Sequence, residues 1–170
     1  MIKIITLMCG LPGSGKSTWI YDHTDGVYSA SVVSRDQIRF SMLTDEEEYF
    51  SKENEVFDKF IDRINEEIEN DETFTIFVDA THLNPKARAK VLDRLNLHKD
   101  CRLNAIYFDI PLDICLERNA KREGRALVPE TVIKNMNNSY HFPTISEGFN
   151  NIWRVDKDGN FDLKEEKKYE

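Results

Sequence analysis

The segment from Gly10 to Ser17 reads GLPGSGKS and fits the pattern G-x-x-x-x-G-K-[ST]. Glycines let the backbone of such a loop wrap closely, so that successive N–H groups point at phosphate oxygens. Lys16 would reach the β- and γ-phosphates of a nucleotide, and the Ser17 hydroxyl would bind Mg²⁺. The alternative is a chance glycine-rich turn, which the apolar run before it and the helical pattern after it disfavour. We therefore expect ATP and Mg²⁺ to bind here, through Gly10, Pro12, Gly13, Ser14, Gly15, Lys16, Ser17 and Thr18.

A second pair of reactive groups follows the next apolar run, where residues 34–39 read SRDQIR. If a helix begins at Asp36, that carboxylate and the guanidinium of Arg39 lie three residues apart on one face. The carboxylate could then accept the proton of an attacking hydroxyl, and the arginine could hold a phosphate of the acceptor. A plainer interpretation, with Asp36 as a helix N-cap and Arg39 as a solvated residue, stays open at this point.

A third acidic group, Asp79, follows the apolar run at residues 74–78. An aspartate at the carboxyl end of a central strand beside a phosphate loop can hold Mg²⁺ or its water, as a Walker-B acid does. Ser17 and Asp79 are therefore the candidate metal ligands. The alternative for Asp79 is a polar cap on the turn that follows the strand.

Residues 118–125 read RNAKREGR and carry four basic residues against one acid. In a lid, Arg118, Arg122 and Arg125 could close on the ATP phosphates and neutralise charge in the transition state. A run of lysine and arginine is often only a solvated face, and for Lys121 and Arg125 that interpretation remains open.

Alternating patterns predict the elements that must position these groups. Apolar runs at Lys3–Cys9 and at residues 31–33, 74–78, 103–108 and 151–155 predict buried strands. Helical spacing covers residues 17–23 and 45–71, and further helices are expected to start near Pro85, Pro111 and Pro129. We expect one domain over residues 1–170, with a parallel sheet covered on both faces and a polar tail at 156–170.

The amino-acid composition limits the kinds of binding partner that the protein is expected to have. The 170 residues hold 23 Lys plus Arg against 31 Asp plus Glu, a net charge of -8, which argues against a broad basic surface for nucleic acid. Residues 45–71 alone contain 12 acids and 3 bases, so the remaining chain is nearly neutral and a narrow site for a strand end is not excluded. Three separated cysteines fit neither a disulfide framework nor a zinc site. With neither a signal peptide nor an apolar span, these features predict a cytoplasmic protein.

Four segments in this order and spacing carry a family resemblance: GLPGSGKSTW, SRDQIR, DATHLNPKAR and YFDIPLDICLERNAKREGRALVPETV. From residue 1 to about residue 140, the chain resembles the kinase domain of phage-type polynucleotide 5′-kinases. That resemblance implies a three-layer α/β P-loop kinase fold, with a central parallel sheet of about five strands, helices on both faces and a small basic lid. It also implies transfer of the ATP γ-phosphate to a 5′-hydroxyl of RNA or DNA, as in nucleic-acid repair.

The resemblance also implies roles for single residues. Asp36 matches the family's general base, Arg39 the arginine on the acceptor phosphate, and Arg122 the lid arginine on the donor phosphates, with Arg118 and Arg125 beside it. His82 stands where asparagine is usual. Because the acid pair of the phage enzyme's phosphatase domain is absent from this sequence, a separate phosphatase or ligase would supply the other repair steps.

Two further function classes remain open on the sequence. The first is a kinase of a small-molecule acceptor such as a sugar, an antibiotic or a nucleoside, because the same loop and carboxylate serve those reactions. The second is an ATP-binding module without transfer chemistry. Arg39 favours an acceptor that carries its own phosphate, since a neutral sugar needs no cation there.

Overall fold

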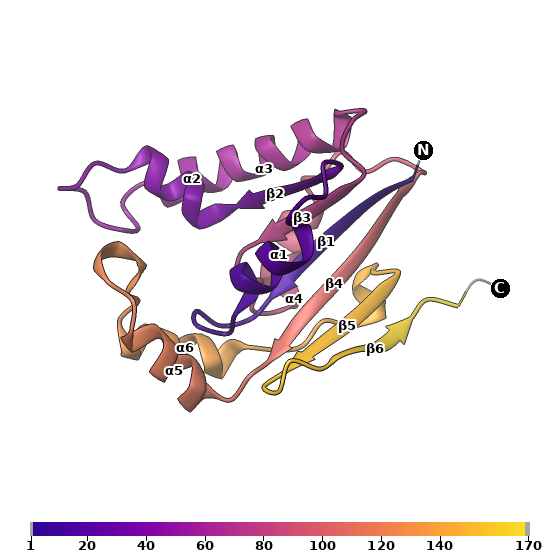
Figure 1. Ribbon diagram of the computed structural model, residues 1–170. Coiled ribbons are helices and arrows are strands. Elements are labelled where there is room, and N and C mark those ends of the chain that lie inside the picture. The colour runs from indigo at the N-terminus through magenta and orange to yellow at the C-terminus, as the bar shows by residue number, and fades with distance from the viewer. Residues whose placement is uncertain (1, 169–170) are drawn as a thin grey trace.

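A computed structural model describes residues 2–168, and its elements alternate between strands and helices (Figure 1). In chain order these are β1 (Lys3–Cys9), α1 (Lys16–Thr24), β2 (Ala30–Ser34), α2 (Arg35–Met42), α3 (Glu53–Glu69), β3 (Thr75–Asp79), α4 (Pro85–Leu92), β4 (Cys101–Asp109), α5 (Leu112–Ala120), α6 (Glu130–Ser139), β5 (Asn151–Asp156) and β6 (Phe161–Glu166). Two short 3-10 turns, η1 (Gly124–Ala126) and η2 (Ile145–Glu147), complete the described secondary structure.

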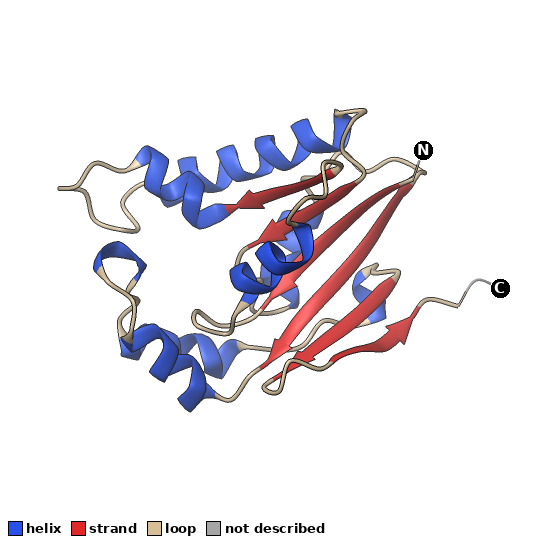
Figure 2. Cartoon of the chain, in the orientation of Figure 1, coloured by secondary structure: helices blue, strands red, loops and turns tan. Residues whose placement is uncertain are grey.

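The strands form one sheet in the order β2-β3-β1-β4-β5-β6, with helices on both sides (Figure 2). All neighbours from β2 to β5 pair in parallel, which confirms the expected α/β kinase fold with its central parallel sheet. Parallel neighbours bring the carboxyl ends of β1, β2 and β3 to the same edge of the sheet. The loops that follow those three strands are therefore neighbours in space.

A sixth strand extends the sheet beyond the five that the sequence patterns predict. Part of the expected polar tail forms β6, which pairs antiparallel with β5. The turn between them is closed by Asp156, whose Oδ1 accepts hydrogen bonds from the backbone N–H groups of Asp158 and Asn160. Phe161 then stacks on Trp153 with ring centroids 4.7 Å apart. Phe161 also contacts Trp19 of α1, with ring centroids 5.3 Å apart. A short hairpin with two aromatic contacts thus orders this segment, although its six residues are all exposed.

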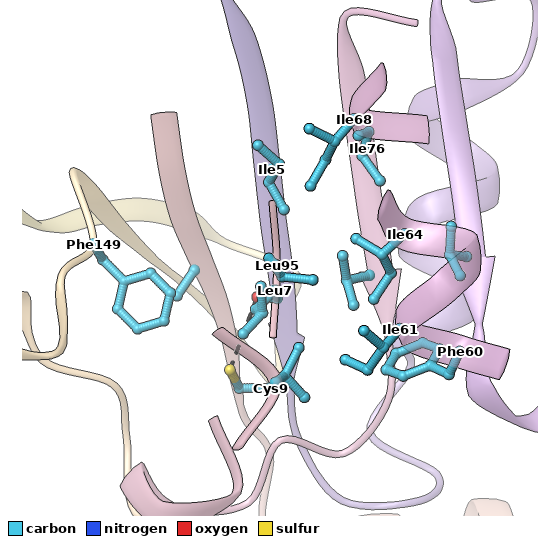
Figure 3. Packing of buried hydrophobic residues seen from close by; sticks show 14 of the residues in the cluster. Ile5, Leu7, Cys9, Phe60, Ile61, Ile64, Ile68, Ile76, Leu95 and Phe149 are labelled. Carbon is cyan, nitrogen blue, oxygen red and sulfur yellow. Dashed lines mark hydrogen bonds between the residues drawn. The ribbon is translucent and has the colours of Figure 1, made fainter. Parts of the chain in front are cut away.

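Two apolar layers hold the sheet between its helices. On one face, Ile5, Leu7 and Cys9 of β1 pack against α3 and α4, and Figure 3 shows this layer with the α3 residues Phe60, Ile61, Ile64 and Ile68. On the other face, Met8 packs with Ile20 of α1 and Cys115 of α5. Alternate residues of β1 thus serve opposite layers, as expected for a strand buried on both faces. Within residues 2–168, no helix is long and apolar enough to cross a membrane.

The expected helix over residues 45–71 is shorter than the pattern indicates. The observed helix α3 starts at Glu53, and residues 43–52 form a loop of turns, so the first part of the prediction is wrong. Phe50, which the pattern places on the buried face, is 56% exposed. Four successive acids at residues 45–48 repel one another and offer no apolar side chain to the core. The backbone instead closes a turn, in which Glu47 accepts from the Thr44 N–H and pairs with Lys52.

Candidate functional site

A cleft enclosing about 250 Å³ lies at the carboxyl ends of β1, β2 and β3. It brings together Pro12, Lys16, Ser17, Asp36, Arg39, Asp79 and Arg122, all of which the sequence singles out. The remaining wall residues are Ser34, Arg35, Tyr49, Phe50, Glu53, Ala80, Thr81, Val128 and Met136. The seven predicted residues come from four separate segments, and the parallel order of β1, β2 and β3 brings three of those segments to the same edge of the sheet.

The loop between β1 and α1 forms the floor of this cleft. Gly13 and Gly15 adopt positive φ angles of 81° and 95°, which side chains other than glycine rarely accept. A Cβ atom on Gly13 would lie 2.4 Å from the carbonyl oxygen of Cys115, so α5 packs directly on the loop. Gly10 donates its N–H to the Thr81 carbonyl at 2.9 Å, and the buried Ser14 hydroxyl has no hydrogen-bond partner among residues 2–168. The backbone thus presents a tight cradle with an unused hydroxyl, which fits a phosphate group.

Lys16 lies at the start of α1 with its ammonium group buried. Its Nζ donates to the carbonyl oxygens of Gly10 and Leu11 at 2.9 and 3.0 Å. Burial lowers the pKa of Lys16 from its ordinary value, and the nearby charge of Asp79 opposes that effect. An anionic phosphate would stabilise the charged form further, so the lysine fits a phosphate-binding role.

Ser17 and Asp79 approach each other across the cleft floor. The Ser17 hydroxyl donates to Oδ2 of Asp79 at 2.8 Å, although 62 residues separate them in the chain. Asp79 ends β3 and is only 9% exposed. A hydroxyl and a carboxylate supply the hard oxygen ligands that Mg²⁺ prefers, so this pair fits the metal that the phosphate loop implies. Asp79 points to α1 and does more than cap its own turn.

Asp36 and Arg39 lie in α2, on the wall of the cleft that also carries Tyr49 and Glu53. Ser34 is the N-cap of this helix and accepts the Gln37 N–H, so Asp36 is not the cap residue. Arg39 donates to the carboxylate of Asp36, and the Tyr49 hydroxyl donates to Oδ1 of the same carboxylate at 2.7 Å. The Asp36 side chain nevertheless remains 60% exposed. Two donors therefore orient a carboxylate that is still free to contact a substrate hydroxyl.

Arg39 is buried rather than solvated, with 4% of its surface exposed. Its Nη2 lies 2.9 and 3.0 Å from the two carboxylate oxygens of Glu53, and its Nη1 donates to the Tyr49 hydroxyl at 2.8 Å. Its guanidinium also stacks on the Tyr49 ring at 4.3 Å. With these partners, Arg39 orients Asp36, and an acceptor phosphate would have to compete with Glu53 for its N–H groups.

Tyr49 and Glu53 are site residues that the sequence analysis missed. They lie 10 and 14 positions after Arg39, in the acid-rich stretch that the pattern assigns to one helix. No local periodicity links such positions, because a loop brings them back over α2. Burial and the Asp36 charge raise the pKa of Tyr49, which keeps its phenol protonated and able to donate.

The three arginines of the basic segment go to different places. Nη1 of Arg118 lies 3.3 Å from the carbonyl oxygen of Ser14, at the phosphate loop. Arg122 lines the cleft. Arg125 reaches the other way and donates to the Thr44 carbonyl in the acceptor-side loop, with Asp45 3.9 Å away. Thr18, on the first turn of α1, is exposed and does not line the cleft.

The loop after β3 is fixed by two buried polar residues whose roles the sequence did not reveal. His82 has a positive φ of 42°, and its Nδ1 lies 2.6 Å from the Met8 carbonyl oxygen. Burial lowers the pKa of His82 to about 4, so its imidazole is neutral near pH 7. Arg88 is fully buried, pairs with Glu147 at 2.7 Å and donates to the His82 carbonyl at 2.9 Å. These contacts tie the loop that follows Asp79 and carries Thr81 to β1 and α4.

Comparisons with known proteins agree with this geometry. Residues 5–143 match a family model described as an AAA domain. An L-seryl-tRNA(Sec) kinase from Methanococcus maripaludis is 31% identical over 147 residues, which cover 82% of this chain and 53% of that protein. The chain thus spans about half the length of that curated relative.

Two solved structures share the fold. A fungal RNA kinase superposes with a TM-score of 0.69 at 16% identity, covering 98% of this chain and 77% of the other. A sugar kinase from Janibacter superposes with a TM-score of 0.61 at 17% identity, covering 92% of this chain and 86% of the other. At such low sequence identities, the superpositions show only that the fold is shared.

Proposed function

Because the chain belongs to the AAA domain family and has the fold of its P-loop kinases, we propose that it is an ATP-dependent kinase whose acceptor is a 5′-hydroxyl end of RNA or DNA. One observation carries the proposal. The exposed carboxylate of Asp36 shares a cleft with Lys16 and with the Ser17–Asp79 pair. A proton acceptor thus faces a phosphate-binding loop, which is what transfer to a hydroxyl requires.

In the proposed reaction, Asp36 orients the attacking hydroxyl and accepts its proton. Lys16 and the N–H groups of the loop hold the transferring phosphoryl group, and Arg122 offsets its charge. Ser17 and Asp79 would hold Mg²⁺, which would supply positive charge to neutralise and orient the ATP phosphates. Most of the rate enhancement comes from positioning the two substrates, because phosphoryl transfer needs little covalent help from the protein.

The nucleic-acid acceptor is supported by the similar proteins. A solved structure with the same fold is named as an RNA kinase, and the curated relative is named for a seryl-tRNA, in which the serine rather than the RNA carries the named hydroxyl. Four basic residues line the cleft, Lys16, Arg35, Arg39 and Arg122, against the acids Asp36, Glu53 and Asp79. A local excess of positive charge in an acidic protein suits one strand end better than a long duplex.

A small-molecule acceptor is the second candidate, and the shared fold with a sugar kinase favours it. The bonds from Arg39 to Glu53 add weight to it, because they reduce the need for an acceptor phosphate at that arginine. An ATP-binding module without transfer chemistry gains no such support, since its cleft would have no use for an oriented carboxylate.

The test is transfer from γ-labelled ATP to 5′-hydroxyl RNA, 5′-hydroxyl DNA and a panel of sugars and nucleosides, assayed in parallel. We expect label on an oligonucleotide, and Asp36→Asn to slow transfer about 100-fold or more. ATP binding should be unchanged in that variant. Asp22→Asn, at an exposed position of α1, is the matched control. Label only on a small molecule would establish the second candidate, and full activity of Asp36→Asn would refute the role of Asp36.

A further inference from the structure

Phe50 is the one large apolar residue of the described chain that is both more than half exposed and part of the cleft wall. It belongs to the loop at residues 43–52, on the same side of the cleft as Asp36. Because Phe50 is 56% exposed, the protein itself buries less than half of this residue, and its position in the cleft wall indicates a surface kept for a ligand.

The ring of Phe50 is held in place by the residues that orient Asp36. It meets Tyr49 edge-on, with ring centroids 4.6 Å apart at 84°, and the Arg39 guanidinium lies 5.7 Å from its centroid. Tyr49 and Arg39 both donate to the Asp36 carboxylate. The Phe50 ring is therefore fixed relative to the Asp36 carboxylate, which would accept the proton of the acceptor hydroxyl. This arrangement can determine where a planar group of the acceptor lies.

The charges near Phe50 limit which part of an acceptor can bind beside the ring. The same loop carries Asp45, Glu46, Glu47 and Glu48 in succession, of which Glu47 pairs with Lys52 and Asp45 lies 3.9 Å from Arg125. These four acids lie outside the cleft lining, so they would repel a phosphate backbone that ran along the loop but not the uncharged face of a nucleobase at Phe50. Stacking on an aromatic ring works for every base, since each has a π face, and it needs no basic surface.

We infer that Phe50 is a stacking platform for the terminal nucleobase of the acceptor, next to the hydroxyl whose proton Asp36 accepts. This inference rests on the proposed function and adds to it how the acceptor is recognised. Base contact, rather than phosphate contact, then provides much of the affinity for the strand end, which explains how a protein with a net charge of -8 could hold one.

The experiment uses two 5′-hydroxyl oligonucleotides that differ only in the terminal nucleotide, which carries adenine in one and lacks a base in the other. For the unchanged protein we expect KM to be about tenfold lower for the oligonucleotide with the terminal base. Phe50→Ala should abolish most of that difference while leaving KM for ATP unchanged. Phe50→Tyr should keep the difference in KM between the two oligonucleotides, because its ring can still stack on a base. Leu97→Ala, at another exposed apolar residue, should behave as the unchanged protein does.

Each other result is decisive. Transfer to both oligonucleotides with a base preference that survives in Phe50→Ala would overturn the stacking platform and leave the proposed function standing. An equal rise in KM for both oligonucleotides in Phe50→Ala would assign the ring to packing of the loop and would also overturn the platform. Transfer to no oligonucleotide, with label on a small molecule instead, would overturn the proposed function and the platform with it.

Discussion

The guanidinium of Arg39 faces both carboxylate oxygens of Glu53, at 2.9 and 3.0 Å, across the boundary between α2 and α3. This ion pair joins the helix that carries Asp36 to the helix that covers the sheet. Arg39 is 4% exposed, so its charge depends on these partners and not on water. The position of the Asp36 carboxylate is consequently linked to the start of α3.

Glu53→Gln tests that link. Removing the negative charge leaves a buried guanidinium with weaker partners, so we expect the free energy of unfolding to fall by roughly 1–3 kcal/mol. Transfer should also slow, by about tenfold, because Arg39 can then turn fully toward Asp36 and displace it. Urea unfolding and labelled-ATP transfer measure the two effects. Glu55→Gln, exposed on the same helix, is the control, and equal behaviour of both variants would contradict the link.

Asp79→Asn tests the metal pair. The amide keeps the size of the side chain and can still accept from the Ser17 hydroxyl, but it carries no charge to attract a divalent cation. We expect the Mg²⁺ concentration for half-maximal transfer to rise about tenfold or more. Magnesium titrations of Asp79→Asn and of the control Asp22→Asn would give this value. An unchanged Mg²⁺ requirement in Asp79→Asn would remove Asp79 from the metal site.

His82 should make stability depend on pH. Its folded pKa of about 4 lies below the value of about 6.5 expected for an unfolded chain. Between these values the unfolded chain binds a proton that the folded chain does not. The neutral, buried imidazole of His82 therefore makes its full contribution to the free energy of unfolding above pH 6.5, and this contribution is lost as the pH falls toward 4. From pH 7 to pH 5, we expect a loss of about 2 kcal/mol from this residue alone.

His82→Asn isolates that contribution, because asparagine tolerates the positive φ at this position. The variant should lose about 2 kcal/mol less than the unchanged protein between pH 7 and pH 5, by urea unfolding at both values. His98→Gln, at an exposed histidine, should follow the unchanged protein. An identical pH dependence of the His82→Asn variant would show that the imidazole is not buried in its neutral form.

Arg118 and Arg125 should separate into donor-side and acceptor-side residues. Arg118 lies at the phosphate loop, so Arg118→Ala should raise KM for ATP, by about tenfold. Arg125 contacts Thr44, so Arg125→Ala should leave KM for ATP unchanged and raise KM for the acceptor, by about threefold for a partly exposed contact. Initial-rate kinetics with each substrate varied in turn distinguish the two. A large effect of Arg125→Ala on ATP alone would return Arg125 to the donor side.

Local patterns were sufficient wherever neighbouring residues carry the signal. The apolar run at Lys3–Cys9 and the glycine spacing after it predict both β1 and the phosphate loop. The helix start expected near Pro85 is also confirmed, since α4 begins at Pro85 and the Asn84 side chain before it accepts the Ala87 N–H. The helix expected over residues 45–71 is partly wrong because helical spacing was extended through acids that have no apolar partner. The strand at Phe161–Glu166 was missed because its order depends on a hairpin contact with Trp153.

The order of residues along the chain is enough to identify the family, the alternation of strands and helices, and the residue types able to bind phosphate or metal and to accept a hydroxyl proton. Which of these groups meet follows from the three-dimensional fold. Ser17 contacts Asp79 because β1 and β3 are parallel neighbours, and Tyr49 and Glu53 join Arg39 because a loop folds back over α2. Such contacts arise from strand order and loop closure, which depend on the packing of the whole chain. No local periodicity of the sequence therefore predicts them.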